Sequence, residues 1–211
     1  MNVLVAGAHG KTGMQIVSLL LENDHHVTAM IKDASQSDSL QKLGAKPLLA
    51  DLETNIDFAT EGIDAVIFAA GSGPDTGADK TIAVDQDGAI KLIDACEKNA
   101  VERFVMLSAM GVDDPENGPD ALQHYLKAKK AADDRLKKSN LNYTIIRPGR
   151  LTNDDESGTI EADESLQEHG EISRADVAMT IIQALDNPNA YRKTIDIIKG
   201  DVKIPEALNN L

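Results

Sequence analysis

The sequence predicts a three-layer α/β fold, in which a doubly wound parallel sheet carries helices on both faces. Two observations lead to this fold class. Short apolar runs alternate with amphipathic stretches as far as residue 147, and a glycine-rich turn joins the first run to the first amphipathic stretch. Alternation of this kind produces parallel strands joined by right-handed helical crossovers. A sheet of this type binds its ligand in the crevice beyond the carboxyl ends of the strands.

The spacing of apolar residues predicts each element in order. Strands are expected at residues 3–6, 26–31, 45–50, 65–70, 103–107 and 143–147. Helices are expected at residues 11–22, 37–43, 57–61, 81–99 and 121–139. The less regular remainder predicts a strand at 158–162, a helix at 174–186, a strand at 193–199 and a helix at 204–209. A chain of 211 residues suits one domain, in which residues 150–211 form a small C-terminal portion that covers part of the crevice.

Glycines at positions 7, 10 and 13 mark the turn between the first strand and the first helix. Gly7 suits a tight turn, Gly10 lets an anion approach the backbone, and Gly13 lets the helix pack closely on the strand. Free amides of the first helical turn then face that anion, so the segment predicts a phosphate cradle for a nucleotide. The alternative is a purely structural turn.

Composition excludes several classes of partner. The formal net charge of −14 would repel nucleic acid, so a small-molecule substrate is expected. No stretch approaches the roughly 18 apolar residues of a membrane span, and no signal sequence is evident, which predicts a cytoplasmic protein. Cys96 is the single cysteine and lies in an apolar helical pattern, so we expect no disulfide and no metal site. The sequence leaves open whether the protein is a monomer or a homodimer.

The end of the second predicted strand favours NADP over NAD. In NAD sites an acidic residue about 20 positions beyond the glycine loop holds the ribose hydroxyls. Ile31 and Lys32 stand there, and the Lys32 cation suits the 2′-phosphate of NADP. A register error of two residues would instead make Asp33 the ribose ligand.

A candidate catalytic set of three residues lies at the end of the fifth predicted strand and on the helix that follows it. Ser108 ends that strand, and Tyr125 and Lys129 lie on the following helix at positions i and i+4, which share one face. The Lys129 ammonium is expected to lower the pKa of Tyr125 from its usual value of about 10, so that the phenol can exchange protons near neutral pH. Ser108 would hydrogen-bond the substrate oxygen. The alternative is that these residues only contact the cofactor.

These residues make the chain resemble the atypical short-chain dehydrogenase/reductases, a branch with NAD(P)-binding, NmrA-like and epimerase/dehydratase-like members. The resemblance covers nearly the whole chain. Its motifs are Gly7-Ala8-His9-Gly10-Lys11-Thr12-Gly13, Asp51-Leu52, Ala69-Ala70-Gly71-Ser72, Ser108, Tyr125 with Lys129, Arg147-Pro148-Gly149 and Ile172-Ser173-Arg174-Ala175-Asp176-Val177-Ala178.

The resemblance implies a single NAD(P)-binding Rossmann domain. Residues 51–52 would lie by the adenine, residues 69–71 would line the cofactor ribose, residues 148–149 would approach the nicotinamide, and Lys129 would bond the nicotinamide ribose. The predicted cofactor-binding residues are therefore Gly7, His9, Gly10, Lys11, Thr12, Gly13, Lys32, Asp51, Leu52, Ala69, Ala70, Gly71, Lys129, Pro148 and Gly149. His9 stands where Thr or Ser is commoner, and either bonds a phosphate or fills space.

Taken together, these features predict an NADP(H)-dependent oxidoreductase that transfers hydride to a small carbonyl-type substrate. Extended epimerases carry a larger C-terminal domain for a sugar nucleotide, and residues 150–211 leave little room for one. Three alternatives remain open: an NADP(H)-binding redox sensor without turnover, a flavin or quinone reductase, and a sugar-nucleotide epimerase-like enzyme.

Overall fold

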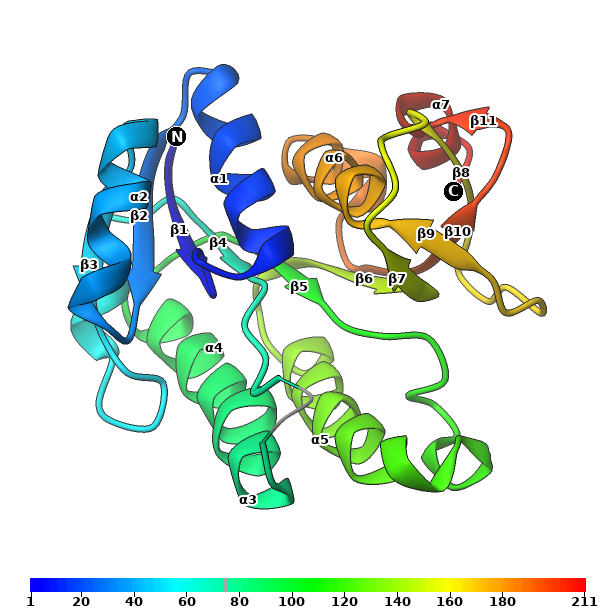
Figure 1. Cartoon of the computed structure of the whole chain (residues 1–211), viewed down its shortest axis with the longest axis horizontal. Helices are drawn as coiled ribbons and strands as arrows, with labels where there is room; N and C mark the ends of the chain where they lie inside the picture. Colours follow the sequence, from blue (N-terminus) through cyan, green and yellow to red (C-terminus); the bar gives the residue numbers. More distant parts are fainter. Residues whose placement is uncertain (74–75) are drawn as a thin grey trace.

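The computed structural model describes residues 1–73 and 76–211 and contains a nine-stranded sheet between two layers of helices (Figure 1). The strand order is β11-β8-β10-β6-β5-β4-β1-β2-β3. Neighbours from β10 to β3 are parallel, whereas β8 is antiparallel to both β10 and β11. The strands are β1 (Asn2–Ala6), β2 (His26–Ile31), β3 (Lys46–Leu49), β4 (Ala65–Phe68), β5 (Arg103–Leu107), β6 (Asn142–Pro148), β8 (Thr159–Asp163), β10 (Lys193–Lys199) and β11 (Val202–Lys203).

Helices cover both faces of the sheet and enclose two apolar cores. Alternate residues of β1 point to opposite faces, so Val3 and Val5 join one core and Leu4 and Ala6 join the other. The first core lies under α1 (Lys11–Glu22), α2 (Ser37–Leu43), α6 (Arg174–Leu185) and α7 (Ile204–Asn209). The second lies under α4 (Ala89–Lys98) and α5 (Asp120–Lys137), on the opposite side in Figure 1. Among the described residues, none of the helices is long and apolar enough to cross a membrane.

The predicted fold class is confirmed, and the differences lie in short or irregular segments. A two-stranded parallel sheet pairs β7 (Arg150–Thr152) with β9 (Glu171–Ser173), and β11 is shorter still; runs this brief show no readable periodicity. The segment predicted as a helix at 57–61 is a 3₁₀ turn, η2 (Asp57–Thr60). Residues 150–211 extend the main sheet through β10, β8 and β11.

The helix predicted at residues 81–99 is divided into three parts. It starts earlier, at α3 (Ala78–Thr81), continues as a π-helical segment, η3 (Ile82–Gly88), and ends with α4. Apolar spacing cannot distinguish a π turn from an α turn over so few residues. π segments occur often at functional sites, and in this one Asp85 accepts a hydrogen bond from the Ser72 amide in the loop after β4.

Candidate cofactor pocket and active site

A cavity of about 380 Å³ opens at the carboxyl ends of β1, β2 and β4, where the strand order reverses. Many of the predicted cofactor residues line it: Gly7, His9, Gly10, Lys32, Asp51, Leu52, Ala69, Ala70 and Gly71. Lys11, Thr12 and Gly13 form the first turn of α1 beside it. Lys129, Pro148 and Gly149 lie outside the lining of this cavity.

Two glycines give the phosphate cradle its shape. Gly7 has φ +82°, and a Cβ there would lie 2.6 Å from the Ala70 backbone, so the loop after β4 packs directly on the loop after β1. A Cβ on Gly13 would overlap the Gly7 carbonyl oxygen. The N-cap of α1, Gly10, offers no side chain to the free amides, and no acidic residue occupies the first turn. These residues therefore fit an anionic phosphate group.

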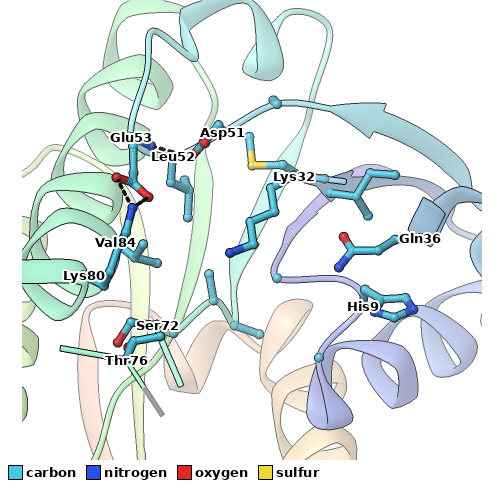
Figure 2. A pocket seen from close by; sticks show the side chains of 18 residues that line it. His9, Lys32, Gln36, Asp51, Leu52, Glu53, Ser72, Thr76, Lys80 and Val84 are labelled. Carbon is cyan, nitrogen blue, oxygen red and sulfur yellow. Dashed lines mark hydrogen bonds and ion pairs between the residues drawn. The ribbon is translucent and has the colours of Figure 1, made fainter. Parts of the chain in front are cut away.

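Lys32 rather than Asp33 faces the pocket. The Lys32 side chain extends into the cavity between the glycine loop and Asp51 (Figure 2). Asp33 caps a 3₁₀ turn instead, because its Oδ1 accepts a hydrogen bond of 2.8 Å from the Ser35 amide. That bond holds the pKa of the Asp33 carboxyl below its usual range. One carboxylate oxygen of Asp33, the residue that would bind an NAD ribose in the alternative register, is thus already hydrogen-bonded, and Asp33 does not line the cavity.

Sequence reasoning did not assign the rest of the pocket lining to the cofactor site. Its further lining residues are Met30, Ile31, Gln36, Ala50, Glu53, Ser72, Thr76, Lys80 and Val84. Lys80 Nζ donates to both carboxylate oxygens of Glu53, at 2.6 and 2.8 Å (Figure 2). No local pattern announces this pair, because the partners are 27 residues apart and meet only in the folded sheet.

The structure brings Tyr125 and Lys129 together on one face of α5. Lys129 Nζ lies 5.9 Å from the centre of the Tyr125 ring and donates a 3.1 Å hydrogen bond to the Leu107 carbonyl. The expected direction of the tyrosine pKa is wrong for this arrangement. Burial raises the pKa of Tyr125 and outweighs the lowering effect of Lys129, and Asp85 and Asp133 raise it further. The phenol therefore keeps its proton near neutral pH.

Ser108 is buried and points toward α5. Its Oγ donates a 3.0 Å hydrogen bond to Asp133 Oδ2, which also accepts from Arg147 Nε at 3.0 Å. Arg147 in turn holds both oxygens of Asp113 at 2.6 and 3.1 Å. Burial raises the pKa of Asp133. Because a hydroxyl has only one hydrogen, Ser108 can donate to a substrate only by releasing Asp133.

Asp85, which the sequence analysis did not single out, links the pocket to Lys129. It is fully buried on η3; its Oδ2 accepts from the Ser72 amide at 2.9 Å, and its Oδ1 lies 3.5 Å from Lys129 Nζ. The signal was present in the sequence. Asp85 precedes Ala89 and Leu92 at helical spacing, which puts an acid on the apolar stripe of a buried helix.

A comparison with known families shows the family to which the chain belongs. A family model described as NAD(P)H-binding matches residues 7–188. The chain belongs to the NAD(P)H-binding family. Its likeness to the atypical short-chain dehydrogenase/reductases is thereby confirmed, and the cavity at the carboxyl ends of the strands is the candidate site for the NAD(P) cofactor.

Relatives of this NAD(P)H-binding protein match it from end to end. YhfK of Bacillus subtilis, described as an uncharacterised sugar epimerase, is 46% identical over all of both chains. A candidate NAD-dependent epimerase/dehydratase from Bacillus halodurans has a structure that superposes with a TM-score of 0.97, at 43% identity and full coverage of both chains. The oxidoreductase YlbE from Lactococcus lactis has a TM-score of 0.87 at 31% identity, covering 100% of this chain and 96% of its own.

Proposed function

We propose that this protein is an NADP(H)-dependent oxidoreductase that reduces a small carbonyl substrate. The observation that supports the proposal most directly is the Tyr125–Lys129 pair, joined through Asp85 and Ser72 to the wall of an NAD(P) pocket. A pocket that only senses the cofactor has no use for a protonated phenol beside an ammonium group.

The proposed roles follow from the chemistry of each side chain. When bound, NADPH would supply the hydride for the carbonyl carbon. Tyr125 donates its phenolic proton to the carbonyl oxygen, and its raised pKa keeps that proton in place near neutral pH. Lys129 would bond the nicotinamide ribose of a bound cofactor, and its ammonium would stabilise the phenolate that Tyr125 becomes. Ser108 orients the substrate oxygen by exchanging its hydrogen bond with Asp133 for one to the substrate.

The preference for NADP is proposed from Lys32. Its ammonium reaches into the pocket, whereas the neighbouring acid, Asp33, is turned to the Ser35 amide. A 2′-phosphate would therefore meet the Lys32 cation, which lines the cavity, whereas Asp33 is not among the lining residues. The glycine loop and the first turn of α1 would hold the pyrophosphate.

The test is NADPH oxidation with a panel of small carbonyl compounds, followed by Tyr125→Phe. We expect Tyr125→Phe to lower turnover at least about 100-fold with unchanged NADPH affinity, because general acid catalysis contributes that much. Tyr191→Phe, which removes a hydroxyl next to the amino end of β10, serves as the matched control.

Other outcomes would assign a different function. Turnover of quinones or flavins that survives Tyr125→Phe would remove the proton-donor role. Interconversion of sugar epimers without net NADPH oxidation would favour a sugar epimerase, which is how YhfK is described. Tight NADPH binding with no oxidation of any substrate class would favour a sensor.

A further inference from the structure

We propose that Asp85 is a positioning residue, whose carboxylate holds the Lys129 ammonium toward the nicotinamide half of the bound cofactor. The inference rests on the proposed function for the contact between Lys129 and the nicotinamide ribose. Asp85 lies outside the set of Ser108, Tyr125 and Lys129, and its proposed role is to orient Lys129.

The two oxygens of Asp85 do different things. Oδ2 accepts the Ser72 amide at 2.9 Å and so fixes the carboxylate to the loop that lines the pocket. Oδ1 faces Lys129 Nζ at 3.5 Å and has no hydrogen-bond partner among the described residues. A fully buried carboxylate oxygen without a hydrogen bond is costly, so its position facing the Lys129 ammonium calls for an explanation.

Lys129 is held but not saturated. Its ammonium has three hydrogens, of which one goes to the Leu107 carbonyl at 3.1 Å. The Asp85 contact is an ion pair at 3.5 Å, and the rings of Phe68 and Tyr125 lie 5.4 and 5.9 Å from Nζ. The side chain is only 3% exposed. Carboxylate, carbonyl and rings therefore fix the direction of Nζ and leave donor capacity for a cofactor hydroxyl.

The backbone around Asp85 supports the same task. A Cβ on Gly71 would lie 3.3 Å from Asp85 Oδ1, so the pocket loop passes directly over the carboxylate. Asp85 belongs to the π-helical segment, whose extra residue per turn changes the direction of the side chains that follow. The charged groups that act on Tyr125 are Lys129 and Asp133 from α5 and Asp85 from η3.

The experiment compares two ligands on Asp85→Asn. NADPH carries the nicotinamide ribose, whereas adenosine 2′,5′-bisphosphate contains only the adenine half. Asparagine keeps an oxygen for the Ser72 amide but loses the charge that holds Lys129. We expect the dissociation constant of NADPH to rise about tenfold, the scale of a charged hydrogen bond, and that of the bisphosphate to stay within about twofold. Asp87→Asn, an exposed acid on the same segment, should change neither.

A double-variant cycle separates positioning from general support of the pocket. If Asp85 acts through Lys129, Asp85→Asn added to Lys129→Met causes no further loss of NADPH affinity. Unchanged NADPH affinity in Asp85→Asn would overturn the proposal. An equal loss of affinity for NADPH and for the bisphosphate, in Asp85→Asn or in the double variant, would also overturn it. Losses of NADPH affinity from the two substitutions that add in the double variant would do the same. Failure of the proposed oxidoreductase function is a separate result, because the unchanged protein would then bind NADPH without oxidising it.

Discussion

Lys80 Nζ forms two hydrogen bonds with the Glu53 carboxylate, and both residues line the cofactor pocket. The pair joins the loop after β3 to the start of the helix at α3. The ion pair neutralises a lysine on the wall of the proposed cofactor pocket. Ion pairs this exposed contribute little to stability, so their effect on the local charge is the more important one.

Glu53→Gln is therefore expected to tighten NADPH binding about threefold, because it frees Lys80 to attract the phosphates. The gain should shrink as salt is added, since exposed charges are screened. Fluorescence titration at low and high salt measures both effects. Asp57→Asn, which breaks the exposed pair with Lys98 outside the pocket, is the control. Weaker NADPH binding in Glu53→Gln would show that the pair is needed to shape the pocket.

Lys32→Ala is expected to weaken NADPH binding about tenfold and to change NADH binding less than twofold, because only NADPH carries the 2′-phosphate that a lysine would pair with. Lys42→Ala removes an exposed charge of the same type from the end of α2. Parallel titrations with both cofactors give the ratio. A similar loss for NADH would refute the proposed preference for NADP.

Gly13→Ala is expected to destabilise the glycine loop by about 2 kcal/mol or more and to abolish NADPH binding, because its Cβ would overlap the Gly7 carbonyl oxygen. Gly77→Ala adds the same methyl group at a position with negative φ and nothing within 4 Å. Urea unfolding and cofactor titration check the two effects. Normal NADPH binding by Gly13→Ala would mean that α1 can move without harm to the cradle.

Asp113→Asn tests the ion pair between Asp113, in the loop after β5, and Arg147. The Arg147 guanidinium holds the pKa of Asp113 below its usual value of 3.8. The stabilisation is therefore complete above pH 3.8 and is lost as the pH falls through the lowered pKa. Because the Asp113 side chain is 69% exposed, the loss at neutral pH should be under about 1 kcal/mol.

Urea unfolding of Asp113→Asn and of the unchanged protein at pH 7 and near pH 2 measures the difference. The difference in the free energy of unfolding between the two proteins should be present at pH 7 and should become smaller near pH 2. Asp114→Asn replaces the adjacent acid, which bonds Asn117 and not Arg147. An equal gap at both pH values would contradict the linkage.

The sequence was sufficient for the parts of this protein that obey local rules. The alternation of apolar runs predicts that the central strands of the sheet are parallel. The spacing of Gly7 and Gly13 predicts a close turn. Helical spacing places Tyr125 beside Lys129. Each of these depends on residues that are close in the chain.

The features that the sequence did not predict depend on contacts between distant segments. Glu53 meets Lys80 across 27 residues, and Ser108 meets Asp133 across 25. The direction of the Tyr125 pKa also depends on distant packing, because burial decides it against the local charge of Lys129. A spacing rule names the charged neighbour on the helix but says nothing of the solvent that the fold removes.

Ser108→Ala distinguishes the two tasks open to this hydroxyl. If Ser108 orients the substrate, the variant should lower kcat/KM about tenfold, the equivalent of one hydrogen bond, with unchanged NADPH affinity. Folding should change little, because Asp133 keeps its bond to Arg147. Ser139→Ala removes a second buried hydroxyl, which bonds the Leu136 carbonyl at the end of α5. Unchanged turnover together with lower stability would mean that Ser108 serves only Asp133, and that Tyr125 positions the substrate oxygen without it.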